Sequence, residues 1–387
     1  MDMQSKAKKL IEMIQTASVE WKPLGEVLVR TKGTKITAGQ MKEMHKDNAP
    51  LKIFAGGKTF ALVDFDDVPD KDIHREPSII VKSRGIIEFE YYDKPFSHKN
   101  EMWSYHSVNK HIYIKYVYYF LKTQESYFRN IGSKMQMPQI ATPDTDNYKI
   151  PIPSLEIQQR IVKILDKFTE LEATLEAELA LRKRQYQYYR DFLLDFDNQI
   201  GGGIADGYKG RLKDVVWKTL GEVCHNISSG KNKKRDINGI YPIYGSTGVI
   251  GKTNEKVYGK QHILVARVGA NAGFVHIGEG EYDVSDNTLI IDNKDNILFG
   301  YLFYVLKNMK LNQFARGAGQ PLLTAGQLKS LKIPIPPLPE QEKITAILDK
   351  FDTLTNSISE GLPHEIALRR KQYEYYREQL LAFPKAA

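Results

Sequence analysis

Two stretches of the chain carry the hydrophobic spacing of long helices. In the first, apolar residues alternate at steps of four and three, as in a coiled-coil seam: Ile157, Ile161, Ile164, Phe168, Leu171 and Leu175. A step of four at Leu179, where three is due, interrupts this seam. It resumes at Tyr186, Tyr189, Leu193 and Phe196. A helix over 154–196 would be roughly 65 Å long, so we expect it to pack along another long helix.

The second stretch supplies that partner. Its seam consists of Ile344, Ile347, Phe351, Leu354, Ile358, Tyr373, Tyr376, Leu380 and Phe383. Pro337, Pro339 and Glu340 predict a helix start, because proline and an acidic residue are favourable in a first turn. Pro363 is expected to kink or break the helix, near four residues that the first stretch lacks. We predict an antiparallel intramolecular pair; two helices that seek separate oligomer partners are the alternative.

Both stretches belong to a tandem duplication with a period of about 190 residues. The segment 149–155 recurs as 332–338, 184–190 recurs as 371–377, and 19–27 recurs as 215–223. The intervening segments, 28–148 and 224–331, differ strongly. One fold kept twice with a changed reading surface explains this pattern, and drift in loops is the plainer alternative.

The pattern predicts an α+β fold. We expect two globular domains separated by two long antiparallel coiled-coil helices, in a pseudo-twofold tandem repeat. The expected segments are an N-terminal helical segment (1–18), the first domain (19–150), the first spacer helix (151–200), a glycine-rich connector (201–214), the second domain (215–332) and the second spacer helix (333–383).

Composition narrows the function classes. The 387 residues are 42% hydrophobic and 26% charged, which excludes a disordered or collagen-like chain. No apolar run reaches the ~18 residues of a membrane span, and the polar, Lys-rich start predicts no secretory signal, hence a cytoplasmic protein. One cysteine excludes an internal disulfide framework and a cysteine-built zinc site. The net charge of +8 favours a polyanionic partner.

No recognisable catalytic motif is present. The segment 245–253 resembles a phosphate-binding loop, but five residues rather than four separate Gly245 from Gly251, and the loop geometry depends on that spacing. His106 and His111 are five apart, the wrong step for one helix face. We therefore expect no catalytic residue, no bound cofactor and no metal site in this chain.

Several motifs, together with the duplication, resemble the specificity (S) subunit of type I restriction-modification systems. They are Tyr-Pro-Ile-Tyr-Gly-Ser-Thr-Gly at 241–248, Leu-Val-Ala-Arg-Val-Gly-Ala-Asn-Ala-Gly at 264–273, Val-Ser-Asp-Asn-Thr at 284–288 and Gly-Gln-Pro-Leu-Leu at 319–323. The resemblance implies two target-recognition domains that each read half of a split site in double-stranded DNA. It also implies spacer helices that dock two methyltransferase subunits, with motor-nuclease subunits in the full complex. S-adenosylmethionine and ATP would then bind those partners.

Residue types suited to DNA contact mark both domains. Arg and Lys recognise guanine, Asn and Gln recognise adenine, and Lys, Arg, Ser and Thr contact phosphates. The candidates of the second domain are Lys231, Lys233, Lys234 and Arg235 as a phosphate clamp, with Ser246, Thr247, Arg267, Asn271, Arg316 and Gln320. Those of the first are Lys58, Arg84, Lys134 and Gln136. The alternatives are a solvated charge run and polar residues that only stabilise turns.

Two other function classes compete with this reading. A coiled-coil scaffold without a DNA role would explain the helices, but not the basic balance or the two diverged domains. A self-contained restriction enzyme would need a further domain, for which the duplication leaves no room.

Overall fold

The segments between the repeated blocks each fold into two small sheets and a few helices. The computed structural model describes residues 3–133, 137–196, 214–317 and 319–384. The glycine-rich connector expected at 201–214 lies, except for Asp214, outside the described residues. The chain divides into two units, 1–175 with 366–387 and 176–365. We describe each unit by itself.

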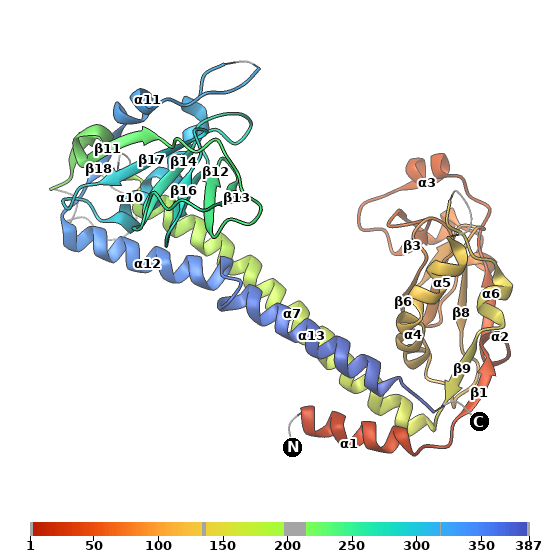
Figure 1. Cartoon of the computed structure of the whole chain (residues 1–387). Helices are drawn as coiled ribbons and strands as arrows, with labels where there is room; N and C mark the ends of the chain where they lie inside the picture. Colours follow the sequence, from red (N-terminus) through yellow and green to blue (C-terminus); the bar gives the residue numbers. More distant parts are fainter. Residues whose placement is uncertain (1–2, 134–136, 197–213, 318, 385–387) are drawn as a thin grey trace. The chain divides into compact units, whose positions relative to one another are not determined.

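The first unit contains the sheet-rich region from β1 to β9, called domain 1 (Figure 1). Its strands are β1 (Glu20–Pro23), β2 (Val29–Lys32), β3 (Leu51–Phe54), β4 (Phe60–Val63), β5 (Ser78–Lys82), β6 (Glu88–Tyr92), β7 (Phe96–His98), β8 (Trp103–His106) and β9 (Lys149–Ile152). Its helices are α2 (Leu24–Val27), α3 (Ala38–Met44), α4 (Ile114–Thr123), α5 (Glu125–Gly132) and α6 (Thr142–Asp146). The first unit also holds α1 (Met3–Gln15), in the expected N-terminal segment.

Strand β5 forms the centre of domain 1. The four-stranded sheet has the order β2-β8-β5-β6, and the second sheet has the order β4-β3-β7. Ile79 and Val81 of β5 pack in the cluster that includes the apolar side of α4, whereas Ile80 packs with Phe54 and Phe96 of the second sheet. Because successive strand residues point to opposite faces, β5 is buried on both sides, which explains its continuous apolar run.

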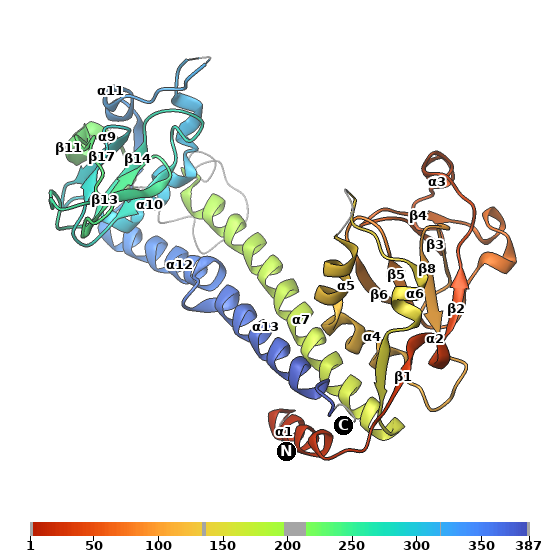
Figure 2. The same cartoon turned by 45° about the vertical axis from the view of Figure 1, so that its right-hand side comes forward.

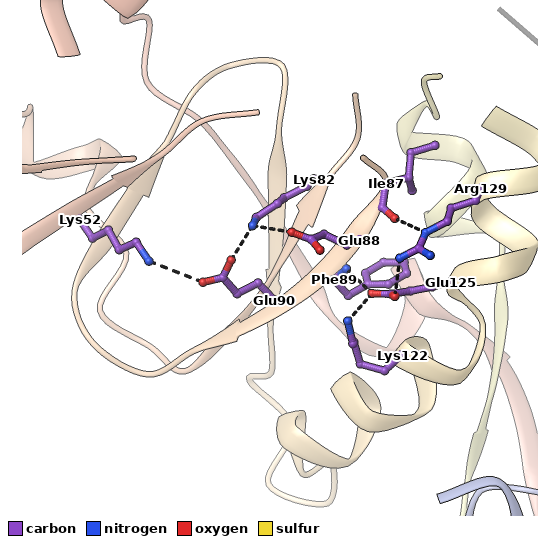
Figure 3. Close-up of polar contacts among 9 residues, drawn as sticks. All are labelled: Lys52, Lys82, Ile87, Glu88, Phe89, Glu90, Lys122, Glu125 and Arg129. Atoms are coloured by element: carbon purple, nitrogen blue, oxygen red, sulfur yellow. Dashed lines mark hydrogen bonds and ion pairs between the residues drawn. The ribbon is translucent and has the colours of Figure 1, made fainter. Parts of the chain in front are cut away.

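Side chains of α5 form hydrogen bonds with backbone groups at β6, the edge strand of the four-stranded sheet of domain 1. The Glu125 carboxylate of α5 accepts the backbone N–H of Phe89 on β6 (3.0 Å) and pairs with Lys122 and Arg129, as Figure 3 shows. Arg129 Nε donates to the carbonyl of Ile87 at 3.0 Å. Unpaired edge groups are templates for aggregation, so these contacts protect β6.

A buried ammonium lies on the same sheet. Lys82 Nζ is 2.7 Å from both Glu88 and Glu90, and Glu90 also lies 3.6 Å from Lys52 (Figure 3). Burial alone would lower the pKa of Lys82, but the two carboxylates raise it above the ordinary value. The lysine therefore stays charged as a structural group.

The second unit contains domain 2, the region from β10 to β18 (Figure 2). Its strands are β10 (Val216–Thr219), β11 (Cys224–Ser229), β12 (Tyr241–Gly245), β13 (Gly248–Thr253), β14 (His262–Ala266), β15 (Val275–Gly278), β16 (Asp283–Val284), β17 (Thr288–Asn293) and β18 (Lys332–Ile335). Its helices are α9 (Leu220–Val223), α10 (Phe299–Asn308) and α11 (Ala325–Lys329). The sheets have the orders β11-β17-β14-β15 and β13-β12-β16, matching domain 1 strand for strand.

Two of the repeated sequence blocks meet in a short ribbon at the base of each domain. Strand β1 pairs with β9, placing Trp21 opposite Pro151, and β10 pairs with β18, placing Trp217 opposite Pro334. In both copies a buried tyrosine hydroxyl, Tyr116 or Tyr301, donates to the carbonyl of the paired proline at 2.9 Å. The retained sequence is thus the joint between each domain and its helix.

Helix α7 (Leu155–Leu194) packs antiparallel to the second copy within each unit. In the first unit, Phe168 stacks on Tyr376 of α13 (Gly361–Leu380), and Glu172 pairs with Arg370 one turn away. In the second unit, Tyr186 stacks on Phe351 of α12 (Leu338–Asn356). The predicted antiparallel pairing and the α+β class are confirmed (Figures 1 and 2).

The second copy is two helices, not one. Helix α12 ends at Asn356 and α13 begins at Gly361, so the extra residues form a break and Pro363 lies in the first turn of α13. The expectation that Ile358 belongs to the seam is wrong: it lies in the break and is 87% exposed. The predicted start of the second helical stretch is confirmed, since α12 begins directly after Pro337.

Candidate nucleic-acid interface

A short turn between β16 and β17, residues 285–287, organises the candidate surface of domain 2; we call it the hub turn. The loop with the four cations, residues 231–235, is called the basic loop. It lies beside the hub turn, because Asn232 donates its backbone N–H to the carbonyl of Val284, the residue before the turn, at 3.0 Å. Lys233 Nζ lies 3.9 Å from the Asp286 carboxylate. The loop and the turn are therefore one surface, although about fifty residues of chain separate them.

The β12–β13 hairpin and the turn after β14 hold the hub turn from two sides. Ser246 Oγ donates to the carbonyl of Asn287 at 3.1 Å. The backbone N–H of Arg267 donates to the same carbonyl at 2.9 Å, and its guanidinium lies 3.5 Å from the carbonyl of Asp286. Arg267 is half-buried, so its side chain supports the turn.

A fourth segment joins through the Arg267 turn. The backbone groups of Arg316 and Leu322 exchange two hydrogen bonds, and Leu323 donates its N–H to the carbonyl of Arg267 at 2.8 Å. Arg316 and Gln320 are both exposed on this loop. The structure thus brings together the loops that carry the ten candidates of the second domain, with Thr247 and Asn271 exposed at the tips of their turns.

The basic loop borders an open hollow of about 1030 Å³. Lys231, Lys233, Lys234 and Arg235 line it, and Asp236, Glu255 and Asp283 line it as well. Of the acidic groups, Asp283 and Asp236 are hydrogen-bonded to asparagine amides, those of Asn232 and Asn254. The four cations are exposed, which suits contact with an extended polyanion.

Strand register places the same turn in domain 1. Val81 pairs with Trp103, and Val265, at the matching position of the repeat, pairs with Leu289. Counting back two residues from each partner puts Glu101 at the position of Asn287. The hub turn of domain 1 is therefore residues 99–101.

Backbone hydrogen bonds support this equivalence independently. Ile140 donates to the carbonyl of Ser83 at 3.0 Å, as Leu323 does to that of Arg267. Thr34 donates to the carbonyl of His98 at 2.7 Å, as Asn232 does to that of Val284. Two loops at each turn are thus attached by the same bonds, with different side chains.

The domain 1 candidates fall at different places. Lys58 is exposed in the β3–β4 hairpin, the counterpart of the Ser246 hairpin. Arg84 donates to Gln139 Oε1 at 3.0 and 3.2 Å. Arg84 corresponds to Val268, one residue beyond Arg267. Lys134 and Gln136 lie outside the described residues.

Sequence reasoning missed a group of cations in domain 1, which come from strand β2, the loop after it and the segment near residue 71. Arg30, Lys32, Lys35 and Lys71 line a hollow of about 800 Å³ beside Asn100 of the hub turn, and Asp67 and Asp72 line it as well. Lys35 is the counterpart of Lys233, since each lies one residue beyond a matched backbone bond. The sequence offered one signal for this equivalence: a glycine directly follows the corresponding strand in both domains, Gly33 after β2 and Gly230 after β11.

That glycine is required by a close backbone approach. A Cβ at Gly33 would lie 2.4 Å from the carbonyl oxygen of His98, and one at Gly230 would lie 2.2 Å from that of Val284. Real Cβ atoms do not come so near a carbonyl. Glycine therefore lets the loop that carries Lys35 or Lys233 lie directly on the strand that leads into the hub turn of its domain.

The residues that the structure describes contain no group of three or more His, Cys, Asp and Glu side chains arranged to hold a metal. The segment 245–253, which resembles a phosphate-binding loop, is a hairpin of β12 and β13. Within the described ranges, no helix has the length and apolarity needed to cross a bilayer.

Comparison with known proteins gives a consistent picture. The family model for the type I restriction modification DNA specificity domain matches residues 19–181 and 213–368. The chain is 34% identical to the Escherichia coli type I restriction enzyme EcoR124I/EcoR124II specificity subunit over 98% of both chains. It is 37% identical to the E. coli EcoprrI specificity subunit, over 64% of this chain and 63% of that one.

Solved structures agree on the fold. A type I restriction-modification S subunit from M. genitalium covers 96% of this chain and 98% of its own, with a TM-score of 0.65 and 18% identity. A family model that matches both repeats, together with a relative that is alike from end to end, settles the membership. The chain belongs to the type I restriction-modification specificity subunits, the non-catalytic DNA specificity subunits of type I restriction enzymes.

Proposed function

We propose that the two domains, 19–150 and 215–332, each read one half of a bipartite DNA site. The observation that carries this proposal is the hub turn, built twice with the same backbone bonds and different side chains. The basic position is kept, as Lys35 and Lys233, whereas Ser83 and Glu101 stand where Arg267 and Asn287 stand. A shared phosphate contact with a changed base contact is the pattern that two readers of different half-sites require.

The repeated helices, within 151–200 and 333–383, are proposed to dock two methyltransferase subunits, which motor-nuclease subunits join. Leu181 and Tyr188 are 49% and 59% exposed on α7, and their repeat counterparts Leu368 and Tyr375 are 42% and 58% exposed on α13. Residues seven apart share one helix face. The same exposed apolar pair, present twice, suits a partner that binds in two copies.

The phosphate clamp is tested by replacing Lys231, Lys233, Lys234 and Arg235 with Ala. Each phosphate contact releases counterions, so the slope of log affinity against log salt should fall by about 0.9 per lost contact. Binding to all DNA sequences should weaken to a similar degree. The measurement is a fluorescence titration of labelled DNA with the complex of the chain and its methyltransferase subunits. Lys329→Ala with Lys332→Ala, exposed on α11 and β18, is the control. An unchanged salt slope in the fourfold variant would count against the clamp, and absence of DNA binding in the wild-type complex would favour the scaffold.

A further inference from the structure

The hub turn of domain 2 holds its backbone rigidly. The N–H of Ser285 donates to the carbonyl of Tyr244 at 2.9 Å, and that of Thr288 closes the turn on the carbonyl of Ser285 at 3.2 Å. The carbonyl of Asn287 accepts two hydrogen bonds, from Ser246 and Arg267. The main chain at Asn287 is thus fixed before any ligand arrives, which lowers the ordering cost of binding.

The side chain of Asn287 is left available by this arrangement. Asn287 is exposed. In the described part of the chain its hydrogen bonds run through the backbone carbonyl, and none involves the amide. The negative charge of its neighbour Asp286 is partly balanced by the Lys233 ammonium, which lies 3.9 Å from the carboxylate. The turn therefore does not present an unopposed negative charge to DNA. An exposed amide on a rigid turn beside a basic loop has the chemistry of a base-reading group.

We propose that Asn287 contacts an adenine in the half-site read by domain 2. An asparagine amide has one acceptor and one donor side, which match N6 and N7 of adenine in the major groove. This assignment rests on the proposed function, since it names a base contact within that DNA site. The carbonyl of Asn287 accepts hydrogen bonds from two of the candidate segments, which places the residue between them.

Domain 1 shows why the position distinguishes the two readers. Its counterpart, Glu101, carries a carboxylate 2.7 Å from Lys99 Nζ. Burial opposes ionisation of Glu101, but the hydrogen bond from Lys99 brings its pKa below the ordinary value. An ionised carboxylate only accepts hydrogen bonds, so it cannot make the paired donor and acceptor contact with adenine. The two hub turns are therefore chemically unlike at the position of the proposed base contact.

The experiment selects bound duplexes from a random DNA pool with the full chain in complex with its methyltransferase subunits. N287A should weaken preference for one adenine of one half-site by about 5- to 150-fold. N287D keeps the shape of the side chain but loses the donor, so the same adenine preference should be lost. N296A is the matched control, because Asn296 is also exposed but lies beyond the other end of β17.

The outcomes separate the two proposals. Loss of preference at one base pair, with the other half-site intact, supports Asn287 as a reader. Unchanged preference at every position in both N287A and N287D would overturn the assignment while leaving the DNA-reading function in place. If N287D keeps the adenine and only N287A loses the whole half-site, the residue acts on the fold of domain 2 and the assignment fails. If the wild-type complex selects no sequence, the proposed function itself fails.

Discussion

Single residues in this chain serve either the joint or the surface. Gln158 and its repeat counterpart Gln341 are fully buried, and their amides donate to the carbonyls of Pro153 and Pro336 at 2.8 Å. Each also accepts a backbone N–H through Oε1, from Tyr113 in one copy and Leu298 in the other, at 2.8 Å. A buried amide with both sides satisfied fixes the angle at which a helix leaves its domain.

A buried histidine should make the stability of the first unit depend on pH. Burial lowers the pKa of His98 to about 4 from its ordinary 6.5. Between pH 6.5 and pH 4, His98 therefore binds a proton in the unfolded chain but stays neutral in the folded chain. As a result, the free energy of unfolding falls as the pH drops through this range. His98→Gln lacks this titration, so between pH 7 and pH 5 its free energy of unfolding should fall by about 2 kcal/mol less than that of the wild type.

Urea unfolding followed by tryptophan fluorescence at both pH values measures this effect. His111→Gln is the control, because His111 is exposed. An H98Q variant with the same loss of stability as the wild type would show that other groups cause the dependence. His74, which stacks on His98 and also has a lowered pKa through burial, is the first such group to examine.

Residue type alone was enough to single out one group of candidates from the sequence, and their role as a phosphate clamp stays a prediction. The four cations of the 231–235 loop are exposed and adjacent. The counterparts in domain 1 escaped notice because the loops match in register and hardly in sequence. Thr34 and Asn232, for example, make equivalent backbone hydrogen bonds in the two domains, but their side chains differ. Pairing between distant strands carries that information, and a single sequence does not display it.

At the scale of elements, the helices could be predicted and the short ribbons could not. The heptad seam correctly placed Ile161, Phe168 and Tyr186 in buried positions. The ribbons β1–β9 and β10–β18 are four residues per strand and join segments more than a hundred residues apart. Such strands carry too little periodicity to be recognised. The helix break at 357–360 was signalled by Pro363, although the chain actually turns at Gly361.

Gly361 should be the position most sensitive to substitution in that break. Its φ is +72°, and an added Cβ would lie 2.4 Å from the carbonyl oxygen of Thr353. Gly361→Ala should lower the free energy of unfolding by about 1–3 kcal/mol through backbone strain and this overlap. Gly259→Ala, where an added Cβ meets nothing within 4 Å, should be nearly neutral. Equal thermal midpoints for the two variants would mean that the break relaxes without cost.

At the scale of the whole molecule, duplication explains how one chain could serve two half-sites and two partners. Each repeat supplies a domain and a helix, and the helices pack on each other within each unit. The repeated blocks build the ribbon and the helix pair, whereas the divergent blocks build the surfaces. A change in one divergent block should therefore leave the scaffold intact.

The docking proposal predicts a stepwise loss of methyltransferase subunits. Leu181→Asp and Leu368→Asp should each remove one subunit, because a charge is placed in one of two equivalent apolar patches. The double variant should remove both. Native mass spectrometry of the assembled complex counts them, with Lys167→Asp, an exposed change elsewhere on α7, as the control. Retention of two subunits in the double variant would place the docking surface elsewhere.

The most direct test of the account is exchange of residues 224–331 for the matching segment of a related specificity subunit, followed by genome-wide mapping of methylated adenines. Two independent readers predict that one half-site changes to that of the donor, while the other half-site and the spacing between them are retained. A change in both half-sites together, or an unchanged recognition sequence, would contradict the assignment of one domain to each half of the site.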